Sequence, residues 1–261
     1  MKSNENEENQ TSVVIALISH YEFNSDKDES AWDFYLKYYG QSLYKNERKK
    51  FHFSNKVESI EVNGDVSFNI DPAFFKPKLF KKREKIYEST LSDTEVSEEL
   101  KISLKVMRYS PMNISILPKT GGLNNIKQSL GNDRFDTFVY FMNQYYEGVK
   151  VPIINSGSTN MGIGNRLILE QFLDGYNCAS EFFADIYGID ETFVSELIEL
   201  GKSLITNKKE YCDYIKLACK YWKSRLEQNK IKNYLSTTMI ENYQAHLNTI
   251  LEEVRVLENS F

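Results

Sequence analysis

The second half of the chain repeats apolar side chains at intervals of three and four residues, the spacing of one face of an α-helix. The first stripe follows Asp133 and stops before Gly148, a residue type that commonly ends helices; its members are Phe135, Phe138, Val139, Met142 and Tyr146. Later stripes with the same spacing cover 167–172, 182–187, 193–205, 211–225 and 243–257. A capping box, Thr238 to Glu241, precedes the last stripe. The C-terminal half is therefore predicted to be mainly helical.

The N-terminal half contains a segment typical of a β-hairpin, residues 57–70, with Asn63-Gly64 as the turn. A two-residue loop would place the apolar side chains of the two strands on opposite faces of the hairpin. A three-residue loop ending at Asp65 pairs Val62 with Val66 and gives one apolar face, so we favour the three-residue loop unless both faces are buried.

Three further segments are predicted as strands: 13–18, 102–106 and 114–116. The first is rich in β-branched residues, and the second alternates apolar with polar side chains. Ser30 is expected to open a helix with one inward face, made of Trp32, Tyr35, Leu36, Tyr39 and Leu43.

These elements predict an α+β fold, in which a small antiparallel sheet from the N-terminal half packs on a mainly helical C-terminal half. Residues 1–11 are expected to form a disordered lead, and residues 12–261 a single α+β domain. The chain is 261 residues long and 41% hydrophobic, which is enough for a full core.

Charge and cysteine content narrow the class of protein. The net charge of −5 argues against a protein built mainly to coat nucleic acid. The three cysteines are too few and too scattered for a disulfide framework, and neither they nor the three histidines predict a metal site. Because the N-terminus lacks the basic and apolar regions of a secretory signal, we expect a cytoplasmic protein without a membrane partner. Frequent Asn and Lys indicate an AT-rich genome, bacterial or phage.

No complete catalytic signature is present, and no cofactor is predicted. Gly157 to Gly162 has the glycine spacing of a P-loop, but Ile163 occupies the position of the essential lysine. The surrounding loop, residues 155–166, could still hold an anion on its backbone N–H groups, with Arg166 adding a fixed charge; the candidate residues are Ser156, Gly157, Ser158, Asn160 and Gly162. The alternative is a flexible surface loop.

A second candidate site lies at Asn132-Asp133-Arg134-Phe135-Asp136. Asp133 could cap the helix that follows, with Asp136 in its first turn and Arg134 paired locally. Alternatively, Arg134 could orient a substrate phosphate or a partner's carboxylate.

The third candidate is a basic, Phe-bearing stretch from Phe74 to Lys85. Residues 76–85 carry six basic side chains and one acid. Such a segment suits single-stranded nucleic acid, an acidic protein or a membrane surface; the alternative is a solvated segment neutralised by the acids that follow. The partner-binding candidates are Phe75, Lys78, Phe80, Lys81, Lys82 and Arg83.

The chain resembles a bacterial family of cytosolic proteins of unknown function. The resemblance rests on blocks in the same order, the most specific being Asp133-Arg134-Phe135-Asp136; the others are Asp26-Lys27-Asp28 with Ser30, Tyr38 through Lys45, Leu91-Ser92-Asp93, Ile116-Leu117-Pro118, Tyr145-Tyr146-Glu147-Gly148 and a late helix at 221–229. Members often have Tyr-His and then Trp-Ser-Lys where this chain has Tyr38-Tyr39 and Leu43-Tyr44-Lys45. The resemblance implies a single unit and no transferable catalytic residues, with Arg134 and Asp136 as the first positions to test.

Three hypotheses of function follow. The leading one is a non-enzymatic protein-interaction protein, a component of phage defence or counter-defence, because aromatic residues dominate the energetics of interfaces. The rival is a nucleotide- or nucleic-acid-acting toxin enzyme using the 155–166 loop, Arg134 or Arg166 as electrostatic stabiliser, and Asp136 or Asp174 as base. The third is a simple nucleic-acid binder. Partner identity and oligomeric state are left open.

Overall fold

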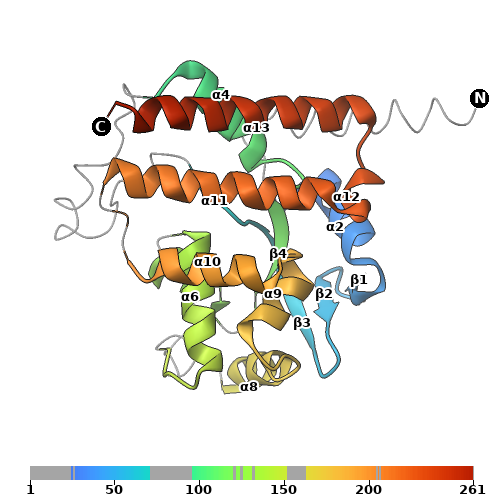
Figure 1. Cartoon of the computed structure of the whole chain (residues 1–261). Coiled ribbons are helices and arrows are strands. Elements are labelled where there is room, and N and C mark those ends of the chain that lie inside the picture. The colour runs from blue at the N-terminus through green and yellow to red at the C-terminus, as the bar shows by residue number, and fades with distance from the viewer. Residues whose placement is uncertain are drawn as a thin grey trace, which may run out of the picture. The chain divides into compact units, whose positions relative to one another are not determined.

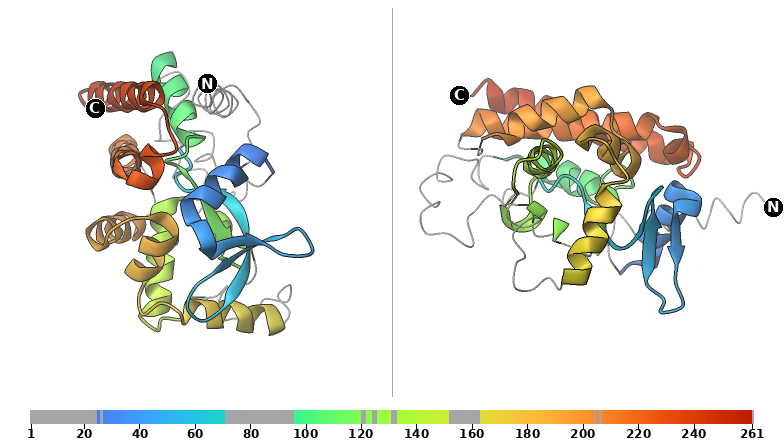
Figure 2. Two further views of the ribbon diagram at one scale, coloured as in Figure 1. Left: turned by 90° about the vertical axis from the view of Figure 1, so that its right-hand side faces the viewer. Right: turned by 90° about the horizontal axis from the view of Figure 1, so that it is seen from below.

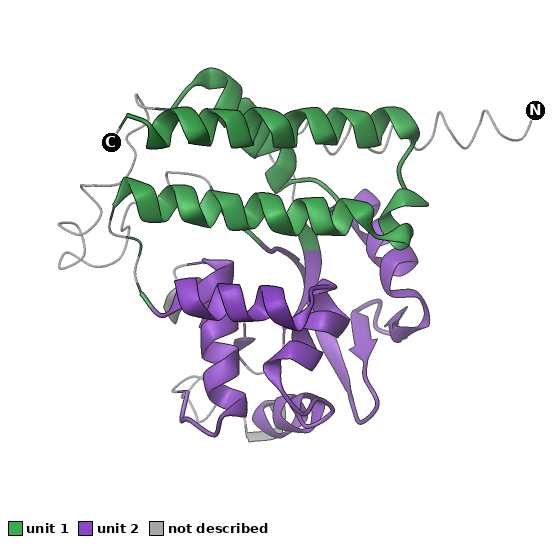
Figure 3. Ribbon diagram, in the orientation of Figure 1, with its two compact units in different colours: residues 1–24, 68–114, 203–261 green, residues 25–67, 115–202 purple. Residues whose placement is uncertain are grey.

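The computed structural model describes residues 25, 27–70, 96–119, 122–123, 126–130, 133–151, 163–203, 205 and 207–260. The chain divides into two compact units (Figure 3). Unit 1 comprises Met1–Asn24, Phe68–Ile114 and Ser203–Phe261, and unit 2 comprises Ser25–Ser67 and Ser115–Lys202. The fold is α+β, as predicted, with its strands in the N-terminal half and mostly helices in the C-terminal half. The single domain expected for residues 12–261 stays a prediction.

Unit 2 holds nearly all of a four-stranded sheet, in the order β1-β2-β3-β4. The strands are β1 (Leu43–Lys45), β2 (Phe51–Ser54), β3 (Ser59–Val66) and β4 (Ile114–Pro118). Antiparallel pairing places Leu43 opposite Phe53 and Phe53 opposite Ile60, and all three are at most 3% exposed. They form the core face of the sheet, because side chains at paired positions point to the same side.

The helices of unit 2 pack around this sheet (Figure 1). Those within the described residues are α2 (Glu29–Tyr39), the short 3₁₀ segment η1 (Gly40–Ser42), the π-helical segment η3 (Ile126–Leu130), α6 (Phe135–Tyr146), α8 (Ile163–Leu173), α9 (Ala179–Tyr187) and α10 (Glu191–Gly201). Phe172 of α8 contacts Phe53 of the core face edge-on, with ring centroids 6.2 Å apart. Gly201 lies directly against α6, where a Cβ would overlap the Asp136 carbonyl oxygen. A glycine is therefore needed at the end of α10 for the two helices to approach.

The described part of unit 1 contains the helices α4 (Glu98–Arg108), α11 (Lys208–Glu227), α12 (Asn229–Lys232) and α13 (Thr237–Glu258). Helix α13 packs against both α4 and α11 (Figures 1 and 2). Ser97, Asn207 and Ser236 cap the three long helices, each side chain accepting a backbone N–H of the first turn. The buried Arg225 of α11 donates to the carbonyl oxygens of Pro111 and Ile114, each at 3.3 Å.

Several sequence predictions are confirmed. Helix α6 begins at Phe135 and ends before Gly148, which has a φ of +77°, and α9 ends at Gly188 in the left-handed conformation. The predicted strand around Ile116 is β4. Strand 13–18 and the lead 1–11 lie outside the described residues.

Other predictions are wrong. Residues 102–106 belong to helix α4 and not to a strand. Strand β3 runs without a break through Asn63-Gly64, so the predicted turn is absent and the hairpin partner of β3 is β2. Leu36 is 38% exposed, while Phe34 and Tyr38 contribute to the buried face of α2 in its place.

None of the helices in the described ranges is long and apolar enough to cross a lipid bilayer.

Candidate functional site

Unit 2 gathers five charged side chains, here called the charged cluster: Asp65, Lys127, Asp133, Arg134 and Asp136. Asp65 lies near the end of β3, Lys127 on η3, and the other three at the start of α6. Lys127, Arg134 and Asp136 are at most 1% exposed. Because burying a charge is costly unless it is paired, each of these groups needs its partners to be present in the folded chain.

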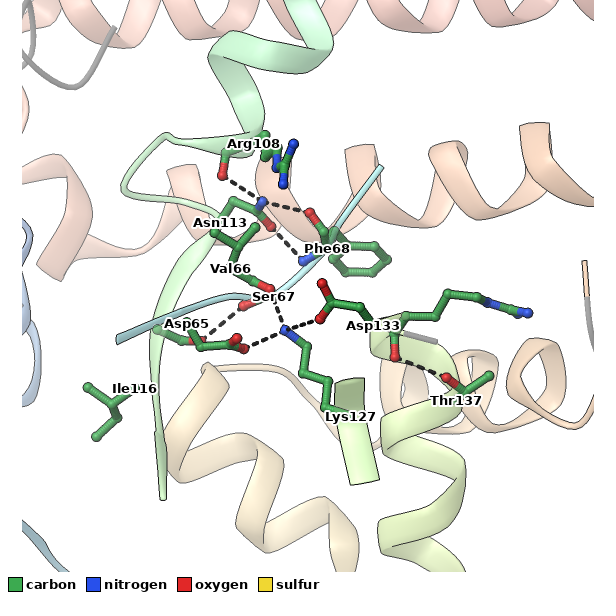
Figure 4. A network of polar contacts seen from close by, with 12 residues as sticks. Asp65, Val66, Ser67, Phe68, Arg108, Asn113, Ile116, Lys127, Asp133 and Thr137 are labelled. Atoms are coloured by element: carbon green, nitrogen blue, oxygen red, sulfur yellow. Dashed lines mark hydrogen bonds and ion pairs between the residues drawn. The ribbon is translucent and has the colours of Figure 1, made fainter. Parts of the chain in front are cut away.

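Lys127 is held by oxygen atoms on three sides (Figure 4). Its Nζ lies 2.5 Å from Asp65 Oδ2, donates to the carbonyl oxygen of Val66, and faces Asp133 Oδ1 at 3.7 Å. An ammonium group has three N–H donors; two of them meet acceptors here, and Asp133 adds a longer ion pair. Asp133 adopts a φ of 59°, and its backbone N–H donates to the Lys127 carbonyl at 2.8 Å, which closes the turn between η3 and α6.

Arg134 and Asp136 form a two-pronged ion pair. Arg134 Nε donates to Asp136 Oδ1 at 3.0 Å, and the terminal guanidinium nitrogen donates to Oδ2. The same carboxylate accepts backbone N–H groups of the first turn of α6, including that of Thr137. Burial raises the pKa of Asp136, while Arg134 and these N–H groups favour the ionised form. Arg134 is the N-cap residue of α6, so Asp133 is not the helix cap that the sequence suggested.

The described contacts of the charged cluster stabilise the fold of unit 2. The donors of Lys127 and the two oxygens of Asp136 face partners within unit 2, and Arg134 is 1% exposed. This arrangement corresponds to the local ion pair that was one of the two alternatives for Arg134 and Asp136. It joins β3 to η3 and fixes the start of α6.

A second group of polar side chains lies at the opposite end of α6, here called the Tyr145 cluster: Tyr145, Arg166, Glu170 and Asp174. Arg166 Nε donates to Glu170 Oε1 at 2.8 Å, and the Arg166 side chain is 36% exposed. Burial raises the pKa of Tyr145, the nearby Asp174 and Glu170 raise it further, and Arg166 lowers it. These side chains reach solvent, unlike Arg134 and Asp136.

The two clusters are separated along α6. Ten residues lie between Arg134 and Tyr145, and at 1.5 Å per helical residue this spacing places them roughly 15 Å apart along the helix. Arg166, whose charge acts on Tyr145, therefore does not meet Arg134 and Asp136 in one site. The anion-binding candidates Ser156, Gly157, Ser158, Asn160 and Gly162 and the partner-binding candidates Phe75, Lys78, Phe80, Lys81, Lys82 and Arg83 lie outside the described residues.

Sequence reasoning missed Lys127 and Asp65. They are 62 positions apart, and neither belongs to a recognisable motif. One signal was available: Lys127 directly follows the apolar residue Ile126, which is fully buried. Within the described residues, no three His, Cys, Asp or Glu side chains are grouped so that they could hold a metal ion.

The chain matches no protein-family model, no curated protein and no solved structure. The resemblance to a bacterial family of unknown function therefore stays a prediction.

Proposed function

We propose that the protein is a cytosolic, non-enzymatic interaction protein of bacterial or phage origin that binds another protein, as a component of phage defence or counter-defence. The observation that supports this proposal is the separation of the groups expected to do chemistry. Arg134 and Asp136 are buried and paired at the start of α6, and Arg166 acts at its far end, roughly 15 Å away. A nucleotide-acting site built from all three would require them to converge.

Helix α8 supplies a surface suited to a protein partner. It buries Leu169, Phe172 and Leu173, but it also leaves Leu167 52% and Ile168 37% exposed. A surface helix ordinarily carries polar residues on its solvent side, and exposed apolar side chains that lie together mark interaction sites. The basic stretch from Phe74 to Lys85 is the second segment that we assign to partner binding, on its sequence alone.

The experiment compares three variants of the full chain in quantitative pull-downs from bacterial lysate. One replaces Leu167 and Ile168 by Ser, the second replaces Lys78, Lys81, Lys82 and Arg83 by Gln, and the third is Arg134→Met/Asp136→Leu. We expect one protein to be enriched by the wild type and by the third variant, and to be lost from either of the first two variants. The same protein retained by both surface variants would refute these surfaces as the contact.

The toxin alternative is tested by growth during expression. The Tyr145 cluster is the observation that keeps it open, because Arg166 and Glu170 reach solvent and closely follow the loop 155–162 in the sequence. Growth arrest by the wild type that Arg166→Ala relieves, at equal level of folded protein, would favour the enzyme and contradict our proposal. Growth that is equal for the two proteins supports the non-enzymatic function.

A further inference from the structure

The β1–β2 hairpin carries a surface that neither proposed protein contact uses. Its outer face, opposite the core face, presents Tyr44 and His52, which are directly paired across the two strands. Tyr44 is 42% exposed. The two rings lie nearly parallel, with centroids 5.8 Å apart and an interplanar angle of 21°. We call Tyr44, His52 and the turn between the strands the hairpin face.

Hydrogen bonds fix both rings in place. The Tyr44 hydroxyl lies 2.7 Å from Ser59 Oγ on β3. Asn46 Nδ2 lies 2.9 Å from His52 Nε2. Side chains held in this way lose little further freedom when a planar group stacks on them, which favours binding. The hairpin face is thus a preformed aromatic platform on the side of the sheet opposite the core face.

Positive charge surrounds the platform. The turn and its neighbours contribute four basic side chains and two acidic ones, a local net charge of +2 in a chain whose net charge is −5; they are Arg48, Lys49, Lys50, Lys119, Glu47 and Glu61. Lys45 is not among them, because its Nζ lies over the Phe51 ring on the opposite face. Lys50 and Lys119 share Glu61, at 2.9 and 3.0 Å. Within the described ranges no ion pair involves Arg48 or Lys49, which are both exposed.

The turn that carries these charges has a defined shape. Lys49 adopts a φ of 58°, and its backbone N–H donates to the Asn46 carbonyl at 2.9 Å. The Asn46 N–H donates in turn to the Lys50 carbonyl at 3.0 Å. Arg48 and Lys49 are therefore held at the tip of the hairpin, where both are exposed and available to an anion.

We propose that the hairpin face binds single-stranded nucleic acid, with an unpaired base stacked on Tyr44 and the adjoining phosphates on Arg48 and Lys49. A ligand that is both planar and polyanionic matches this combination of platform and charge. An acidic peptide would use the charge but not the platform, and a duplex hides the faces of its bases. This activity is independent of the proposed protein contact.

The test is fluorescence anisotropy of the full chain with labelled 20-nucleotide oligo-U, oligo-dT and a blunt duplex at 50 mM salt. We expect both single strands to bind more tightly than the duplex. Tyr44→Ala should weaken single-strand binding about tenfold, the effect of losing one stacked base. Tyr44→Phe keeps the ring and should retain binding, which separates stacking from any effect on the fold.

The charge contribution has its own matched pair of variants. Arg48→Gln/Lys49→Gln should weaken binding and reduce the slope of log affinity against log salt by about 1.4, since each phosphate contact to a single strand contributes about 0.7. Lys223→Gln/Lys232→Gln removes the same charge from exposed positions on α11 and α12 and should leave the slope unchanged.

Three results would overturn the proposal: no binding at 50 mM salt, equal loss in the hairpin and control variants, or competition by poly-glutamate as effective as that by unlabelled oligonucleotide. The last result would assign the hairpin face to an acidic protein. Preference for oligo-U over oligo-dT, or the reverse, identifies which nucleic acid is bound, and both outcomes support the proposal.

Discussion

The ion pair of Arg134 and Asp136 gives the sharpest test of the structure. Asp136 is fully buried and Arg134 is 1% exposed. Removing one partner of a buried pair leaves an uncompensated charge and typically costs about 3–5 kcal/mol. Because a domain is stable by only about 5–15 kcal/mol, we expect Asp136→Leu or Arg134→Met alone to lose a large share of the free energy of unfolding.

Replacing both residues should recover most of that loss. Apolar side chains of similar volume in place of a buried ion pair are often neutral or stabilising. The double variant still lacks the carboxylate that accepts N–H groups at the start of α6, a helix-terminus interaction of about 0.3–1 kcal/mol. Arg134→Met/Asp136→Leu is therefore expected within about 1 kcal/mol of the wild type.

Urea unfolding followed by far-ultraviolet circular dichroism measures these differences. With a slope of about 3 kcal/mol per molar urea, each single variant should unfold at a midpoint roughly 1 M or more below the wild type. The double variant should unfold close to the wild type. A single variant with an unchanged midpoint, or a double variant as unstable as the singles, would refute the reasoning.

Three further predictions concern stability and reactivity. Burial lowers the pKa of His246, so this imidazole binds a proton more readily in the unfolded chain than in the folded one. The free energy of unfolding should therefore fall as pH drops through about 6.5. His246→Phe should reduce the difference between the urea midpoints at pH 7.5 and 5.5. Gly201→Ala, whose Cβ would overlap the Asp136 carbonyl oxygen, should cost about 1–3 kcal/mol in thermal unfolding, and an unchanged melting temperature would contradict the close packing of α10 on α6. Ellman's reagent should titrate one thiol per native chain, the exposed Cys178, and three in urea, because the two cysteines of α11 are buried with pKa values raised to about 11 and about 12.

Helix α4 includes residues that were wrongly predicted as a strand, and its burial pattern shows why. The alternation of Ile102, Leu104 and Val106 indicates a strand, yet Ile102 is 56% exposed in the structure. The buried residues of α4 are Leu100, Ser103, Leu104 and Met107, a helical spacing with a serine in it. The helix is capped by Ser97 and has Glu98 and Glu99 in its first turn, local signals that the strand prediction did not use and that are more informative here than a short alternation.

The predicted turn at Asn63-Gly64 was wrong for a different reason. The pair is a strong hairpin signal when only neighbouring residues are considered. In the structure Gly64 lies within β3, at a point where a Cβ would overlap the carbonyl oxygen of Ser25. The glycine is required by the close approach of a distant segment, which a sequence pattern does not reveal.

The candidate site was partly predictable. The pairing of Arg134 with Asp136 is a contact between residues two apart, so the local sequence contained it. The contact of Lys127 with Asp65 depends on the whole of unit 2, and composition gives no indication of it. The helices of the C-terminal half were predictable because their apolar spacing and glycine stops are properties of each segment alone.

The buried ammonium of Lys127 also constrains the order in which the chain folds. Its acceptors on β3 are 61 and 62 positions away, and contacts between distant segments form slowly because a long loop must close first. If η3 became buried before β3 had joined the sheet, the positive charge would lie in apolar surroundings without acceptors, at a cost of several kcal/mol. The segment 126–130 is therefore expected to become ordered in a late step of folding, after the strands have paired.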